Sequence, residues 1–387
     1  MTTVSAPPIR DVAPAGTVPW YLWCAALAVT SAYVGGYWDI SWHRSIGRDT
    51  FWSAPHMAIY ACGVLAGLSA AYLIVTTTFG RNPLREVSVR IWGLTAPAGA
   101  FICAWGGVAM LASAPFDDWW HNAYGLDVRI ISPPHMVLAA GFFGIEFGTV
   151  ILLLAFMNRA SERARRALQW LFLYVGGMAL SESLLLKLEY IARPDMHNAL
   201  FFIVVSLGTP AILMAIAVAS ERRWACTIIT AVYTVFGIGF LWLLPLFPAQ
   251  PKLGPVYHPV THFIPWEFPL LVIVPAFAVD LLLQRTAGWR PLVRAIAAGL
   301  VFLIVFAAVQ WPFANFLMTP PARNWFFGTH YFDYGTPPRS AYARFIFAQR
   351  DATALQFWRG MGLAALSSCV MTWIGLHVGR AMQGVRR

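Results

Sequence analysis

The chain has 387 residues, of which 59% are hydrophobic and only 11% are charged, and its mean hydropathy is +0.62. These values exclude an ordinary soluble globular domain and predict an all-α polytopic membrane protein. The net charge of +10 does not indicate a nucleic-acid partner. Most basic residues stand in short segments between apolar runs, where they orient helices in a bilayer. The lipid bilayer is therefore the first partner that the sequence predicts.

The N-terminal tail, residues 1–18, is polar and rich in proline, and it lacks the Lys/Arg cluster that is typical of a signal peptide. We therefore expect the apolar run that follows to be retained as a transmembrane helix. The chain contains ten candidate spans, each near the length of about 20 residues that crosses a bilayer. They cover residues 19–38, 55–79, 91–114, 134–157, 167–190, 199–220, 224–247, 267–284, 295–316 and 353–378.

Arginine clusters follow the second, fourth, sixth, eighth and tenth of these spans, so that every second loop is basic. This alternation is the pattern of the positive-inside rule. It predicts about ten transmembrane helices in a bacterial-type cytoplasmic (inner) membrane, with both termini in the cytoplasm. The other loops, including the long segment 317–350, would then lie on the periplasmic, outer side.

Two stretches on that outer side repeat one pattern of polar residues. In the first, Asp39 and His43 are four apart and share one face of a helix, and His56 begins the next apolar run. One carboxylate and two imidazoles are a common ligand set for copper, zinc or iron. Three protein ligands also leave a position open for water, dioxygen or substrate. Asp49 is a candidate for a hydrogen bond that fixes the tautomer of a ligand.

The second copy places Asp117 and His121 four apart and His135 at the start of the following apolar run, with Asp127 as the counterpart of Asp49. Trp, Gly, Ser, Pro and Met recur at corresponding positions. The neighbouring Asp118 is an alternative carboxylate, although the Trp-His register favours Asp117. The repeat therefore predicts two similar metal sites.

A simpler interpretation is an interfacial helix end, where Asp and His bond water or cap the backbone. A duplication that preserved packing alone would not need the histidines, so the repeat favours metal binding. His258 and His262 are also four apart, with Glu267 nearby. Several prolines among them disfavour a regular helix, and we interpret this segment as an ordinary loop.

A polar linker, SERARR at 161–166, separates the repeat-bearing part of the chain from the rest. We take it as a module boundary. The predicted organisation is the tail 1–18, a four-helix module at 19–166 with both metal-site repeats, and a six-helix module at 167–387 with the outer loop 317–350.

The stretch WDISWHRSIGRDT at 38–50, followed by SAPH at 53–56, resembles the first copper-site segment of the C subunit of particulate methane monooxygenase and ammonia monooxygenase. FDDWWH at 116–121 with PPH at 133–135 resembles the second site of the same subunit. The family has Asn where this chain has Asp117, and the Asp adds negative charge to a cation site.

The second module is similar to the A subunit of these enzymes. FPLLVIVPA at 268–276 resembles one of its membrane segments, and YGTP at 334–337 with YAR at 342–344 resembles its outer Thr-Gly-Thr-Pro stretch. The resemblance thus implies a C-subunit-like module fused to an A-subunit-like module. The chain contains no counterpart of the soluble β-rich copper domain of the family's B subunit, which a separate partner could supply.

The resemblance implies a copper-dependent membrane monooxygenase with one or two copper ions, for which zinc could substitute in the same ligands. The substrate would be small and apolar, of the hydrocarbon or ammonia class, and electrons would come from a reductant such as a quinol. The sequence does not indicate a quinol site or an oligomeric state, and it is compatible with a homo-oligomer.

Two other functions use the same residues. A copper-handling protein would exchange metal without turnover. A transporter would relay protons or cations through intramembrane carboxylates such as Glu146, Glu182 and Asp280.

Overall fold

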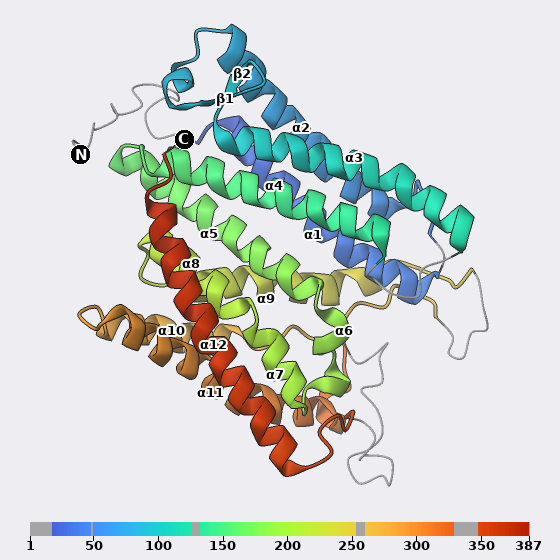
Figure 1. The fold of residues 1–387 in the computed structure, drawn as a ribbon. Coiled ribbons are helices and arrows are strands. Elements are labelled where there is room, and N and C mark those ends of the chain that lie inside the picture. Colours follow the sequence, from blue (N-terminus) through green and yellow to red (C-terminus); the bar gives the residue numbers. More distant parts are fainter. Residues whose placement is uncertain (1–17, 48, 126–131, 253–259, 329–346, 387) are drawn as a thin grey trace. The chain divides into compact units, whose positions relative to one another are not determined.

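A computed structural model describes residues 18–47, 49–125, 132–252, 260–328 and 347–386 (Figure 1). It is 76% helical, and eight of its helices are long and apolar enough to cross a membrane. These helices indicate a multi-pass membrane protein. Helices α1 (Trp20–Ser45) and α10 (Ile273–Arg285) overlap the two remaining predicted spans. α1 has 26 residues but is less apolar than the eight, and α10 has only 13 residues. The number ten and the cytoplasmic termini stay predictions.

The chain divides into two compact units. The first comprises Met1–Gly36, Thr50–Val175 and Ala381–Arg387, and the second comprises Tyr37–Asp49 and Gly176–Arg380. The division falls after Val175 within α5 (Glu162–Leu185), and the polar segment 161–166, most of which forms the start of α5, does not separate the units. The module boundary expected at 166 therefore stays a prediction.

The first unit contains the N-terminal part of α1 and the three following long helices, α2 (Ala54–Phe79), α3 (Ala98–Tyr124) and α4 (Pro133–Met157). Between α2 and α3 lie a short 3₁₀ helix, η1 (Pro83–Val87), and a hairpin of β1 (Val89–Ile91) and β2 (Leu94–Ala96), which pair antiparallel with Val89 opposite Ala96. α3 and α4 run side by side (Figure 1).

Small residues allow α3 and α4 to pack at close range. A Cβ atom added at Gly106 would lie 2.6 Å from the backbone nitrogen of Ile145, and one added at Gly148 would lie 2.7 Å from that of Cys103. Any side chain at these positions would therefore separate the backbones. Close approach of this kind is common between helices in membranes, where packing drives association. The contact holds the C-terminal end of α3 near the N-terminal end of α4.

Replacing Gly106 with alanine is expected to destabilise the first unit by about 1–3 kcal/mol, the usual cost of inserting a methyl group into a tight core. Thermal unfolding of the purified protein in detergent would measure the loss. Gly67 on α2 is the matched control, because a Cβ added there would meet no atom within 4 Å. Equal unfolding temperatures for the two variants would contradict the close α3–α4 packing.

The second unit contains the C-terminal ends of α1 and α5 and most of the remaining helices. They are α6 (Leu188–Ile191), η2 (Arg193–Asp195), α7 (Ala199–Ser206), α8 (Thr209–Ser220), α9 (Ala225–Leu243), η3 (Leu244–Leu246), α10, α11 (Pro291–Leu317), η4 (Pro320–Ala322) and α12 (Ala354–Gln383). The span predicted at 199–220 is thus divided into α7 and α8. The span predicted at 267–284 becomes helical only from Ile273, and residues 267–271 form no regular secondary structure.

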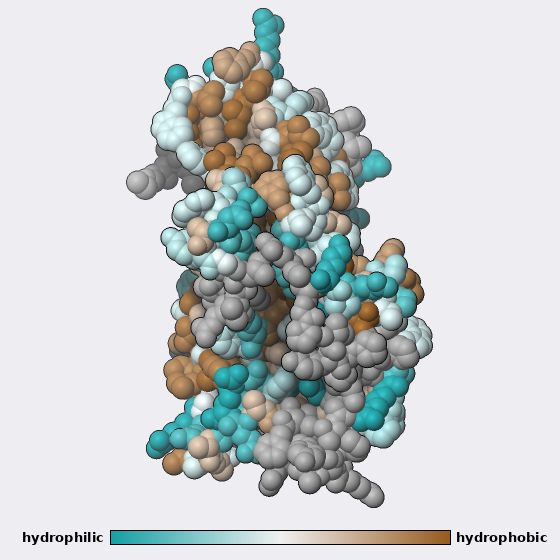
Figure 2. All heavy atoms as spheres, turned by 90° about the vertical axis from the view of Figure 1, so that its right-hand side faces the viewer, coloured by the Kyte–Doolittle hydropathy of each residue, from teal (hydrophilic) through white to brown (hydrophobic). Residues whose placement is uncertain are grey.

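Many apolar side chains remain on the surface, as lipid-facing helices require. Trp105, Val108 and Leu111 of α3 are examples, each with more than half of its area exposed. Figure 2 shows hydrophobic residues over part of the face that it draws. In water such patches would favour aggregation, whereas in a bilayer they contact acyl chains.

Candidate metal centres

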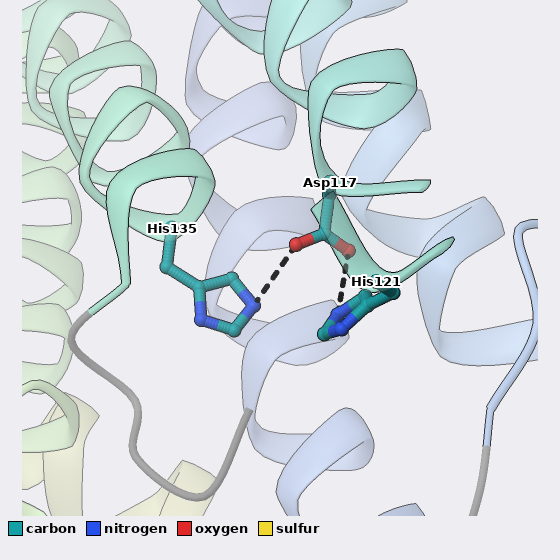
Figure 3. A group of neighbouring side chains, drawn as sticks. All are labelled: Asp117, His121 and His135. Atoms are coloured by element: carbon teal, nitrogen blue, oxygen red, sulfur yellow. Dashed lines mark ion pairs between the residues drawn. The ribbon is translucent and has the colours of Figure 1, made fainter. Parts of the chain in front are cut away.

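The second copy of the repeat forms a compact group of three side chains within the first unit. Asp117 and His121 lie on the last two turns of α3, and His135 lies in the first turn of α4. His121 Nε2 is 3.4 Å from Asp117 Oδ2, and His135 Nε2 is 3.6 Å from Asp117 Oδ1. Figure 3 shows the carboxylate between the two imidazoles, with each ring turned toward one of its oxygens. The structure thus brings together all three ligands predicted for this site.

These distances suit a shared metal ion. Ligand atoms about 2.0–2.1 Å from a tetrahedral ion are about 3.4 Å from each other. One potential ligand atom from each of Asp117, His121 and His135 lies within 4.8 Å of the others. All three side chains are partly exposed, which leaves an approach for a further ligand. Imidazole and carboxylate ligands without a thiolate suit divalent copper, zinc or iron.

The tautomer of His121 supports a cation at this position. Its Nδ1 lies 3.1 Å from the carbonyl oxygen of Gly125, which can only accept a hydrogen bond, so Nδ1 carries a proton. The other ring nitrogen, Nε2, faces the Asp117 carboxylate. The lone pair of His121 Nε2 and the negatively charged Asp117 Oδ2 would repel each other unless a proton or a metal ion lay between them. The Gly125 carbonyl therefore directs Nε2 toward the metal position.

Gly125 can occupy this position because it ends α3 in a conformation that only glycine adopts readily. Its φ is +91°, and its N–H donates to the carbonyl of His121. Gly47, the corresponding glycine of the first copy, has φ +95°, and its backbone accepts a hydrogen bond from His43. The repeated glycine is thus a hydrogen-bond partner of the imidazole in each copy. On sequence alone, we expect Asp49 and Asp127 in this role.

The first copy places three of its residues together in the second unit. His43 Nε2 lies 3.5 Å from Asp39 Oδ2 and 3.7 Å from Asp49 Oδ2. Asp49 thus approaches the same ring nitrogen as Asp39, on the side where a metal would bind. His56 begins α2 in the first unit, with its ring 6.0 Å from that of Tyr60. Its part in the first site stays a prediction.

The C-terminal end of α1, which carries Asp39 and His43, is held by hydrogen bonds to the segment before α10. Ser41 Oγ donates to the carbonyl of Ile264, and the N–H of Ile264 donates to Ser45 Oγ, both at 2.7 Å. Arg44 donates to the next carbonyl, that of Pro265, at 3.0 Å. These bonds restrain the helix end directly beside His43.

The carboxylates around His43 favour its charged form. A hydrogen bond with Asp39, together with the negative charges of Asp39 and Asp49, raises the pKa of His43 to about 9, although burial lowers it. The imidazole lies beyond the span predicted at 19–38. At neutral pH it therefore holds a proton when no metal is bound, and a metal ion at Nε2 must displace that proton.

Two other polar residues that the sequence analysis considered, Glu267 and His262, have structural partners. Glu267 accepts a hydrogen bond of 2.5 Å from the backbone N–H of Arg193. His262 forms an isolated bridge with Pro248, and its ring lies 2.9 Å from Thr261 Oγ1. Neither belongs to a metal group among the described residues.

Asp280 and His197 also have identified environments. Asp280 of α10 accepts hydrogen bonds from the backbone N–H and the hydroxyl of Thr227, at 2.8 and 2.7 Å, in the first turn of α9. It therefore caps that helix. His197 stacks between Trp311 and Phe347, with ring centroids 4.1 and 3.6 Å away. Hydrogen bonding to α9 thus accounts for the position of Asp280, and ring stacking accounts for that of His197.

Several other polar residues of the sequence are either buried or outside the described residues. Glu146 and Glu182 are buried in α4 and α5. Asp127, His258 and His330 lie outside the described residues.

Comparison of the chain with protein-family models, curated proteins and solved structures found no match.

Proposed function

We propose that this chain is a copper-dependent membrane monooxygenase-like protein. It would oxidise a small apolar substrate, of the hydrocarbon or ammonia class, with dioxygen on the outer side of a bacterial-type cytoplasmic membrane. The observation that carries the proposal is the position of the Asp117 carboxylate between the imidazoles of His121 and His135. The repetition of this ligand pattern in the sequence, and its resemblance to the copper segments of methane and ammonia monooxygenases, supports copper over other cations.

Each residue would have a defined task. Asp117, His121 and His135 would hold one ion in the second site, and Asp39, His43 and His56 would hold another in the first. Copper in such sites supplies redox chemistry with dioxygen at an open coordination position. The Gly125 carbonyl keeps the proton of His121 on Nδ1, which leaves Nε2 available as a ligand. Asp49 could accept the proton that His43 releases when metal binds.

The proposed reaction also needs a route for the substrate and a source of electrons. The partly exposed ligands lie at helix ends, where an apolar substrate dissolved in the bilayer could reach them. A quinol or another reductant would supply electrons, and a separate soluble copper subunit or a second copy of the chain could contribute to assembly.

Metal analysis of the purified protein, followed by incubation with labelled dioxygen and either small hydrocarbons or ammonia, tests this function. Copper at one or two ions per chain, with label from dioxygen in the product, is the expected result. Copper that exchanges without any product would favour a copper-handling protein. Protein that fails to retain copper, even after reconstitution with the metal, would contradict both functions.

The predicted topology has its own test. In a variant whose five native cysteines are replaced by serine, single cysteines in place of Trp52 and Tyr124 should react with an impermeant maleimide in cells with a permeabilised outer membrane. Trp52 and Tyr124 are 74% and 68% exposed beside the two repeats. A cysteine in place of Trp92, 82% exposed at the turn of the β1–β2 hairpin, should react only after the inner membrane is disrupted. The opposite labelling pattern would invert the orientation.

A further inference from the structure

The apolar segment Ala199–Ser220 is interrupted between α7 and α8. α7 ends at Ser206, α8 begins at Thr209, and Gly208 between them has φ +109°. Such an interruption creates two helix ends, whose terminal carbonyl and N–H groups have no intrahelical partners. Within a bilayer these groups require another polar partner, because lipid offers none. The interruption reaches the surface of the second unit, since Leu207 is exposed.

Lys187, two residues after the end of α5, contacts this interruption. Its ammonium donates hydrogen bonds to the carbonyl of Leu207 and, at 3.2 Å, to Ser183 Oγ. A Cβ atom added at Gly208 would lie only 2.9 Å from Lys187 Nζ. Within the described parts of the chain, the ammonium has hydrogen bonds to uncharged oxygens and no carboxylate partner. A partly buried cation with this environment lacks a counter-charge.

Two hydroxyls at the same interruption also lack partners. Ser206 and Thr209 are fully buried, and among the described residues neither Oγ of Ser206 nor Oγ1 of Thr209 forms a hydrogen bond. Buried hydroxyls usually find a partner. Thr209 is the first residue of α8, a helix of 12 residues whose N-terminus carries partial positive charge. A cation, two hydroxyl donors and a helix N-terminus all favour a ligand with negatively charged oxygen atoms.

We propose that the interruption between α7 and α8 binds an anionic oxygen group of the carboxylate or phosphate class. The Lys187 ammonium supplies the counter-charge, and the Thr209 hydroxyl and the N-terminus of α8 donate hydrogen bonds. The group belongs either to a small free anion or to the phosphate of a lipid headgroup. The site is independent of the copper centres and does not depend on the proposed oxygenase activity.

The test uses the full chain in an uncharged detergent, with two probes. In the first arm, thermal unfolding is followed while chloride is replaced by formate or inorganic phosphate at constant ionic strength. In the second, native mass spectrometry measures binding of phosphatidylglycerol and of a phosphate-free galactolipid. The variants are Lys187→Met, which removes the charge, and Thr209→Val, which removes the hydroxyl but keeps the shape of the side chain. Lys252→Met is the control, because Lys252 is exposed and distant in sequence.

Binding of one probe should weaken about tenfold or more in Lys187→Met, the effect expected from losing a charge-assisted hydrogen bond. It should weaken severalfold in Thr209→Val and remain unchanged in Lys252→Met. Stabilisation by formate or phosphate would identify a free anion, whereas selective retention of phosphatidylglycerol would identify a lipid. If neither probe binds the parent protein, or if Thr209→Val and a folded Lys187→Met bind like the parent, the proposal is wrong. Lys187 would then only satisfy the Leu207 carbonyl.

Discussion

Replacing His135 with alanine is expected to remove one copper ion per chain and to abolish dioxygen-dependent product formation. His135 is the only one of the three second-site ligands on α4, so without it Asp117 and His121 remain on a single helix face. Two ligands of one helix cannot enclose an ion as three can, and the affinity should fall by several orders of magnitude. Copper content after exhaustive dialysis and the rate of product formation would measure both effects.

The fold should survive this substitution, because His135 lies partly exposed at a helix start, and an unchanged circular dichroism spectrum would verify it. His262→Ala is the control, since His262 contacts Thr261 and belongs to no metal group among the described residues. Full copper content in a folded His135→Ala variant would eliminate the second site.

Alanine at Asp39 and alanine at Asp117 should both abolish activity, but they should release copper to different extents. Asp117 contacts both imidazoles of its site, one with each oxygen, so its loss removes the group that joins them. Asp39 shares His43 with Asp49, which approaches the same nitrogen and can remain as a carboxylate ligand. We therefore expect the larger loss of copper in Asp117→Ala.

Copper titration of the two variants, followed by electron paramagnetic resonance, would measure this difference. Asp118→Ala is the matched control, because Asp118 is adjacent to Asp117 but exposed, and its carboxylate lies 3.4 Å from the side-chain amide of Asn122. Equal copper loss from the Asp39 and Asp117 variants would mean that Asp49 does not act as a ligand. Loss of copper from Asp118→Ala would instead indicate that the wrong carboxylate had been assigned.

Local periodicity made much of the second site predictable. A spacing of four on a helix places Asp117 beside His121 whatever the rest of the chain does. His135 follows Pro134, a residue suited to the first turn of a helix, so a helix beginning there was expected. The convergence of the two helices depends on close packing at Gly106 and Gly148, which the ligand pattern alone does not reveal.

Other features depend on backbone geometry that side-chain patterns do not encode. Gly47 and Gly125 recur in the repeat, yet their role becomes evident only from their positive φ angles and their contacts with the imidazoles. In the sequence, only the recurrence of the glycine in both copies could have indicated this role. The interruption at Gly208 was missed for a similar reason, since the residues from 199 to 220 form one continuous apolar run by composition. A hydropathy pattern measures transfer to lipid and does not report where a helix breaks.

The proposed second metal site takes all its candidate ligands from two helices that are consecutive in the sequence. One uninterrupted stretch of coding sequence therefore encodes all the ligands of such a site. Asp117 follows Asp39 by 78 positions (117 minus 39), so a single tandem duplication of one helix pair would copy every ligand at once. Afterwards each copy could change separately, as the additional residue between His121 and His135 illustrates. Gene fusion or fission outside the helix pair would also leave the ligand set intact.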